Sequence, residues 1–66
     1  MTLTINGEER SFGGVSTLAA LVAELGLDAR KVAVERNLEI VPRSAYGGTA
    51  LADGDRIEIV HFIGGG

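Results

Sequence analysis

The residues best suited to chemistry in this sequence are the three glycines at its end, Gly64, Gly65 and Gly66. They have no side chains, so the group that we expect to react is the carboxylate of Gly66. A carboxylate is a poor electrophile until it is activated, for example as a mixed anhydride with AMP, which a sulfur nucleophile can then displace. Because such an activation takes place in the nucleotide site of another protein, we expect no catalytic residue in this chain.

The position of these glycines favours a reactive tail over a frayed end or a cloning remnant, which is the plain alternative. They follow His61-Phe62-Ile63 without a spacer, so they would project directly from a strand. Glycine has no Cβ, and a glycine tail can therefore enter a channel too narrow for other residues. Fully extended, residues 63–66 would reach about 13 Å beyond the fold.

The side chains offer no competing reactive cluster. His61 is the only histidine and the chain has no cysteine, so we expect no metal site and a solvent-facing His61. Asp53-Gly54-Asp55 resembles the start of a calcium loop, but further ligands do not follow, and the triplet is typical of a turn. We expect solvated side chains, or contacts at the rim of an interface, for four arginines: Arg10, Arg36, Arg43 and Arg56.

Strands are the main elements that the hydrophobic pattern predicts. Alternating or short apolar runs indicate strands over residues 2–6, 8–12, 31–35, 39–41 and 56–62. Asn6-Gly7 predicts a tight hairpin between the first two, because both residue types accept positive φ. We expect an irregular segment with a short 3₁₀ turn over residues 43–52.

A single helix is expected between the second and third strands. Leu18, Leu21, Val22 and Leu25 lie at helical spacing and form one apolar stripe. Ser16 or Thr17 can cap the start of this helix. Gly26 can end it, because glycine adopts the left-handed conformation at little cost.

The order of these elements is that of the β-grasp arrangement, an α+β fold in which one helix packs across a mixed sheet of four to five strands. In that arrangement the last strand lies between the first and the third and runs parallel to the first. A chain of 66 residues makes one domain. We assign residues 1–63 to the domain and residues 64–66 to a flexible tail.

An exposed apolar surface is predicted beside the tail. Val60 and Phe62 alternate with Ile57 and Ile59, which we expect to face the core. We predict that Val60 and Phe62, together with Ile63 beyond the sheet, dock on a partner protein; simple packing is the alternative.

Composition limits the partners and the compartment. The net charge of −3 argues against nucleic acid as a partner and favours a protein with a basic face. The absence of cysteine suits the reducing cytoplasm. We expect no membrane association and no leader, because no apolar run approaches the roughly 20 residues needed to cross a bilayer.

Several motifs resemble the sulfur carrier family of bacterial thiamin biosynthesis, which is ubiquitin-like. They are Ile5-Asn6-Gly7-Glu8, Val32-Ala33-Val34-Glu35-Arg36-Asn37 and the segment 51–60, which runs into a glycine pair that matches Gly65-Gly66. The resemblance covers essentially the whole chain. It implies a β-grasp fold and a chain that is not an enzyme but carries sulfur as a thiocarboxylate on Gly66.

The same resemblance implies the partners. They are an ATP-dependent adenylating enzyme related to ubiquitin-activating enzymes, a sulfur donor fed from cysteine, and thiazole synthase as the acceptor. ATP would be used by the adenylating partner, and no cofactor is expected to be bound by this chain.

Three other functions remain open at this stage. The small subunit of molybdopterin synthase shares the fold and tail chemistry but usually has a longer chain. A β-grasp module could bind a partner without covalent change. A protein modifier could use the same activated end to form isopeptide bonds.

Overall fold

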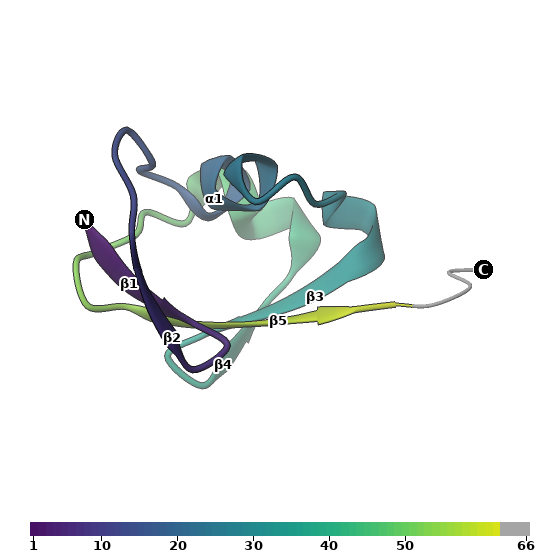
Figure 1. The fold of residues 1–66 in the computed structure, drawn as a ribbon. Coiled ribbons are helices and arrows are strands. Elements are labelled where there is room, and N and C mark those ends of the chain that lie inside the picture. The colour runs from purple at the N-terminus through teal and green to yellow at the C-terminus, as the bar shows by residue number, and fades with distance from the viewer. Residues whose placement is uncertain (63–66) are drawn as a thin grey trace.

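The computed structural model describes residues 1–62, which form a five-stranded sheet with one α-helix across it (Figure 1). In chain order the elements are β1 (Thr2–Ile5), β2 (Glu8–Ser11), α1 (Leu18–Glu24), β3 (Val32–Arg36), β4 (Glu39–Val41) and β5 (Arg56–His61). Two 3₁₀ helices, η1 (Ala29–Lys31) and η2 (Arg43–Gly48), lie before β3 and after β4. None of the helices in this part of the chain has the length and apolarity that crossing a membrane requires.

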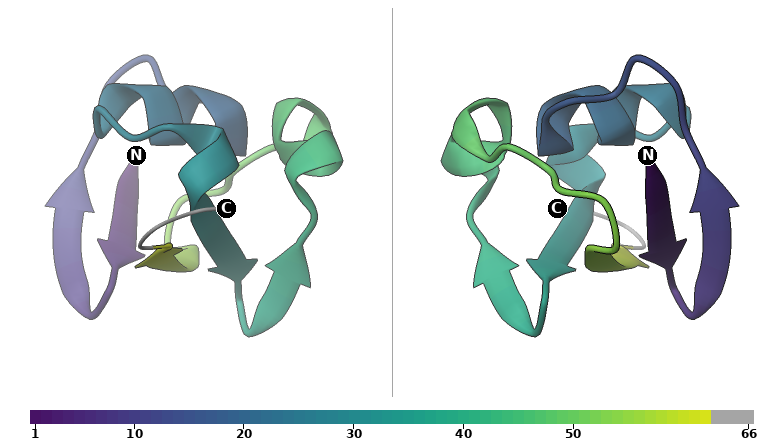
Figure 2. Two further views of the ribbon diagram at one scale, coloured as in Figure 1. Left: turned by 90° about the vertical axis from the view of Figure 1, so that its right-hand side faces the viewer. Right: turned by 90° about the vertical axis from the view of Figure 1, so that its left-hand side faces the viewer.

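The strand order in the sheet is β2-β1-β5-β3-β4. β5 lies between β1 and β3 and pairs with β1 in parallel, whereas the other three pairs are antiparallel. Figure 2 shows β5 nearly end-on, at the centre of the sheet, with α1 over one face. This is the predicted β-grasp arrangement, and the prediction that the last strand lies centrally and parallel to the first is confirmed.

Two tight turns join the outer hairpins. Asn6 and Gly7 have φ values of 49° and 83°, as the Asn-Gly signal predicted. The β3–β4 turn has the same left-handed geometry at Asn37 and Leu38, with φ values of 50° and 72°. Leucine rarely adopts this conformation, so the second turn carries backbone strain at Leu38.

The helix buries the predicted stripe against the sheet. Leu18, Leu21 and Val22 are buried, and Leu25 packs against the core at the C-terminal end of α1. The hydroxyl of Thr17 accepts a hydrogen bond from the backbone N–H of Ala20 at 3.2 Å, so Thr17 is the N-cap. The chain leaves the helix through Gly26 at φ 74°. The predicted helix and its start and end signals are confirmed.

The segment after β4 contributes a core residue that the sequence pattern does not reveal. η2 holds Tyr46, which is 4% exposed, against the core. Burial raises the pKa of the Tyr46 phenol. The 3₁₀ turn was predicted, but this buried tyrosine was not.

Four strands, β1, β2, β3 and β5, differ from the prediction by one residue at one or both ends. Asn6 belongs to the first turn, since its φ is positive. Lys31 belongs to η1, and its N–H donates to the carbonyl oxygen of Asp28 at 2.9 Å. β2 ends at Ser11, and β5 at His61, just before Phe12 and Phe62 respectively.

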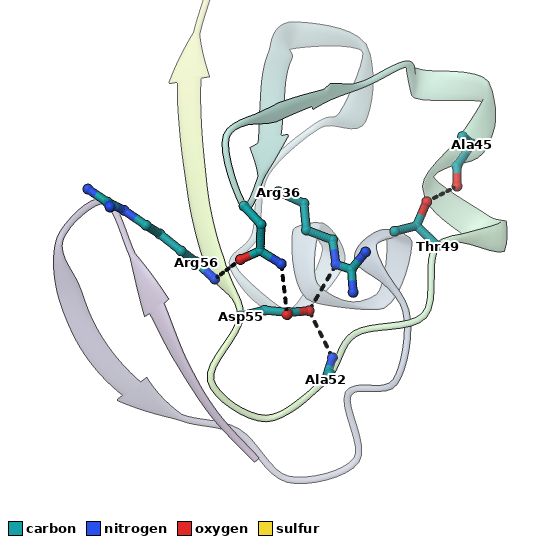
Figure 3. A network of polar contacts seen from close by, with 7 residues as sticks. Arg36, Ala45, Thr49, Ala52, Asp55 and Arg56 are labelled. Carbon is teal, nitrogen blue, oxygen red and sulfur yellow. Dashed lines mark hydrogen bonds and ion pairs between the residues drawn. The ribbon is translucent and has the colours of Figure 1, made fainter.

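The expectation that Arg36 is solvated or part of a rim contact is wrong. Its Nε lies 2.9 Å from Oδ2 of Asp55, the buried carboxylate directly before β5 (Figure 3). Asp55 also accepts from the backbone N–H of Ala52 at 2.8 Å and from Nδ2 of Asn37 at 3.1 Å. The Asp53-Gly54-Asp55 turn is therefore a link between β5 and the β3–β4 hairpin.

Candidate functional site at the C-terminal end of β5

β5 is the strand that leads to the predicted reactive tail. The residues predicted to react or to form the tail, Gly64, Gly65 and Gly66, and the docking candidate Ile63, lie outside residues 1–62 that the structure describes. What the fold determines is how β5 is held before them. β5 runs past the end of β1, so the two sides of its last residues have different neighbours (Figure 1).

β3 holds one side of β5 to its end. The register pairs Val34 with Ile59 and Val32 with His61. One residue further on, the N–H of Phe62 donates to the carbonyl oxygen of Lys31 at 2.8 Å. Backbone pairing on this side therefore reaches Phe62.

A single side chain holds the other side of β5. Pairing with β1 stops at Ile5 and Ile57, and the backbone N–H of Asn6 then donates to the carbonyl oxygen of Ile57 at 2.9 Å. The Asn6 side chain accepts from the N–H of Ile59 at 2.7 Å and donates to its carbonyl oxygen at 3.2 Å. The amide of Asn6 thus takes the place of one more residue of β1.

Sequence reasoning treated Asn6 only as a turn residue and missed this clamp. Asn6 and Ile59 are separated by 53 positions, and a local pattern contains no information on such a contact. Neither the Asn6-Gly7 turn signal nor the Ile5-Asn6-Gly7-Glu8 motif names the partner strand.

The apolar surface predicted on β5 faces away from α1. Val60 is 61% exposed and Phe62 is 51% exposed, so their predicted exposure is confirmed, whereas their docking role stays a prediction. Ile40 on β4 is 77% exposed and was not predicted as part of this surface. The register Ala33–Val60, Glu35–Glu58 and Glu35–Ile40 places Ile40 on the same face as Val60. We call Ile40, Val60 and Phe62 the outer patch.

A shallow hollow of about 280 Å³ borders the outer patch, and Ile40, Phe62 and two arginines line it. Arg30 is paired with Asp28, with Nη2 3.0 Å from Oδ2, and the side-chain hydrogen bond from Arg30 lowers the pKa of Asp28 to about 2. Arg43 is exposed and has no ion-pair partner within residues 1–62. The cation available to an acidic partner here is therefore Arg43.

His61 is exposed, as expected for a solvent-facing residue. In the described part of the chain, no three His, Cys, Asp or Glu side chains form a group that could hold a metal. Nothing in that part of the chain brings a base to a nucleophile either, so the site consists of a held strand end, an apolar patch and nearby cations.

The comparison with family models bears directly on this arrangement, since the model of the ThiS family matches residues 3–66. The chain belongs to the ThiS family. Its similarity extends from the first strand to the glycine end, and therefore includes both the clamped strand and the residues that follow it.

Two curated relatives differ in how much of their length resembles this ThiS-family chain. A thiazole synthase of Paramagnetospirillum magneticum is 65% identical over 66 residues, which are all of this chain but 20% of that protein. The sulfur carrier protein ThiS of Bacillus subtilis is 42% identical over 65 residues, which are 97% of this chain and 98% of that protein. The chain spans about a fifth of the length of the first curated relatives that it matches.

A solved structure agrees with the fold. The crystal structure of the thiamine biosynthesis protein ThiS from Geobacter metallireducens superposes with a TM-score of 0.84 and 36% identity, and each chain is covered completely. The described part of the chain therefore has the ThiS β-grasp fold.

Proposed function

We propose that this chain is the sulfur carrier for the thiazole moiety of thiamin, and that the carboxylate of Gly66 carries the sulfur. The observation that supports the proposal most is the match of the ThiS family model through Gly66, together with full-length similarity to the sulfur carrier of B. subtilis. The same match favours the thiamin branch over a molybdopterin synthase subunit.

The proposed reaction has two steps on one carboxyl group, the first at its oxygen and the second at its carbon. An oxygen of the Gly66 carboxylate attacks the α-phosphorus of ATP in an adenylating partner, and pyrophosphate leaves. Sulfide derived from cysteine then attacks the carbonyl carbon, the bond between that carbon and the AMP oxygen breaks, AMP leaves, and a thiocarboxylate remains. This chain contributes the reacting carboxylate and acts as a cosubstrate, not as a catalyst, while ATP is bound by the partner.

Thiazole synthase is the proposed acceptor of the sulfur. The P. magneticum and Magnetococcus marinus relatives are both named thiazole synthase, and in each the segment similar to this chain is a fifth of the protein. A carrier segment within the same polypeptide as the acceptor would raise the local concentration of one for the other. These names support a partnership between the two functions.

The fold contributes a fixed starting point for the tail. β3 holds Phe62 on one side, and the Asn6 side chain holds Ile59 on the other. Because few residues then separate the held strand from Gly66, the carboxylate would be delivered at a limited distance from the domain. The outer patch beside this strand is the proposed docking surface of a partner, with Val60 and Phe62 at its centre.

The test is the intact mass of the chain after incubation with ATP, sulfide and the adenylating enzyme. We expect a gain equal to the difference between a sulfur and an oxygen atom, located at Gly66 by fragmentation, and no gain for a variant without Gly66. The protein isolated from its source must also carry Gly66 as a free end. No mass gain, or a natural chain that continues uncleaved past Gly66, would refute the proposal.

A further inference from the structure

The sheet becomes narrower toward the end where β5 finishes. At Ile57 it is five strands wide, because Glu8, Ile5, Ile57, Arg36 and Glu39 follow one another across the register. At His61 only β3 and β5 remain, since β1 pairs no further than Ile57 and β4 no further than Val34. The last residues of β5 therefore have an open edge on the side that β1 leaves.

Hydrogen bonds show which backbone groups face this open edge. The carbonyl oxygen of Ile57 and the N–H of Ile59 both point to Asn6, whereas the N–H of Phe62 points to β3. Backbone groups of successive strand residues point to opposite sides, so those of His61 point to the same side as those of Ile57 and Ile59. Within residues 1–62, no hydrogen bond is found for the backbone N–H of His61 or for its carbonyl oxygen.

A hollow of about 400 Å³ lies beside this edge. Its apolar wall is made by Ile5 and Ile59 of the sheet and by two leucines that follow α1, Leu25 and Leu27. Helix α1 ends at Glu24, just before these two leucines. A strand added at His61 would place alternate side chains toward the hollow, and an apolar side chain fits its wall.

A guanidinium lies at the same place. Arg10 lines the hollow, as does the imidazole of His61. Arg10 lies over the ring of Phe12, 5.4 Å from its centroid, and has no ion-pair partner in the described part of the chain. An incoming segment with a carboxylate next to its apolar residue would therefore meet an uncompensated guanidinium.

We propose that an extended segment of thiazole synthase, with an apolar residue next to an acidic one, pairs with β5 at His61 and fills this hollow. The inference rests on the proposed function, because Gly66 lies only five positions after His61 and the sulfur acceptor must approach it. An unpaired edge supplies backbone hydrogen bonds, the hollow selects the apolar residue, and Arg10 selects the acidic one. The surface is distinct from the outer patch, which faces away from α1.

The backbone contact can be tested by replacing a single backbone group. Chemical synthesis of the 66-residue chain allows the N–H of His61 to be replaced by an ester oxygen, which keeps the imidazole. We expect the dissociation constant for thiazole synthase to rise about tenfold, as for the loss of one hydrogen bond. The matched control is the same replacement at Gly13, an exposed residue for which no backbone hydrogen bond is found, and there we expect no change.

The charge contact can be tested by reversing the charge of Arg10, with the same reversal at Arg56 as a control. We expect Arg10→Glu to weaken binding of thiazole synthase by about tenfold or more, and the difference from wild type to shrink as salt is added. Arg56→Glu is the control, because Arg56 is exposed at the other end of β5. Thermal unfolding of each variant would verify that the fold is retained.

The outcomes separate this inference from the proposed function. Unchanged affinity for thiazole synthase in both the ester and the Arg10→Glu variants would overturn the docking proposal, even if sulfur loading of Gly66 proceeds. A loss confined to loading by the adenylating enzyme would assign the edge to that enzyme and would also overturn it. Weakened binding to thiazole synthase with normal loading is the result that we expect.

Discussion

The guanidinium of Arg36 and the carboxylate of Asp55 form an ion pair at 2.9 Å in which the carboxylate side chain is 8% exposed. Arg36 ends β3 and Asp55 precedes β5, so the pair joins the β3–β4 hairpin to the start of the strand that leads to the tail. Burial alone would raise the pKa of Asp55. The hydrogen bonds from Ala52, Asn37 and Arg36, with the charge of Arg36, outweigh burial and lower the pKa below its ordinary value of 3.8.

The lowered pKa of Asp55 predicts how stability depends on pH. A carboxyl group whose pKa is lower in the folded state stabilises fully above its unfolded-state pKa and loses that contribution as the pH falls through the folded-state value. We therefore expect wild type to exceed Asp55→Asn in free energy of unfolding at pH 7, and this difference to shrink below about pH 4. Urea titrations at several pH values would measure it.

Asp28 is the main confounding group, since its pKa is also lowered. The proteins with Asp55 and with Asp55→Asn should therefore both carry Asp28→Asn when they are compared. A difference between them that stays constant from pH 7 to the acid limit would contradict the role given to the Asp55 carboxylate.

The Asn6 clamp predicts a local weakening of β5. Asn6→Gly keeps the turn, because glycine adopts positive φ readily, but it removes both side-chain hydrogen bonds to Ile59. We expect a loss of about 1–2 kcal/mol in stability. Hydrogen exchange of the Ile59 amide should become faster, and unchanged exchange there would show that the clamp does not hold the strand.

The strained turn at Leu38 predicts that a glycine substitution there raises stability, whereas Asn6→Gly lowers it. Leu38 has a φ of 72° and is 73% exposed, so its side chain has few contacts to lose. The left-handed conformation costs about 1–2 kcal/mol for a residue with a Cβ, and the entropy of glycine offsets part of the gain. We expect Leu38→Gly to stabilise the fold by up to about 1 kcal/mol in chemical denaturation.

Leu38→Ala serves as the matched control for that turn. It removes the exposed apolar side chain but retains the Cβ, so no comparable gain is expected. Equal stabilisation by both substitutions would mean that backbone strain at position 38 is not the cause.

The narrow-channel argument predicts that Gly65→Val blocks sulfur loading. A β-branched side chain is bulky and stiff, and it should be excluded from a channel that admits glycine. Mass spectrometry of the loading reaction would measure the effect. Gly13→Val is the control, because a Cβ at Gly13 meets no atom within 4 Å; loading of the Gly65→Val protein at the wild-type rate would contradict the argument.

Local sequence patterns were sufficient for the elements themselves. The stripe of Leu18, Leu21 and Val22 and the cap at Thr17 depend on neighbours within one or two turns of the helix. The Asn6-Gly7 turn likewise depends on the φ preferences of two residues. The order of the strands in the sheet came from the β-grasp arrangement that these elements match, not from periodicity.

The contacts that position β5 could not be predicted in the same way. Arg36 and Asp55 are 19 positions apart, and Asn6 and Ile59 are 53 apart, so neither pair shares a local pattern. Because arginine is usually exposed, the sequence predicts a solvated Arg36, and only the tertiary fold supplies its partner. Tyr46 lies among small residues of η2 with no apolar periodicity to mark it as buried.

The side chain of Asn6 has a consequence for any strand that pairs with the open edge of β5. Because it already occupies the backbone groups of Ile59, an added strand can pair with β5 at His61 but not at Ile59. The side-chain amide of Asn6 thus sets the register of a docked strand relative to Gly66. Five residues of the sequence follow His61, so a strand docked there would have a set number of residues between its pairing point and the Gly66 carboxylate.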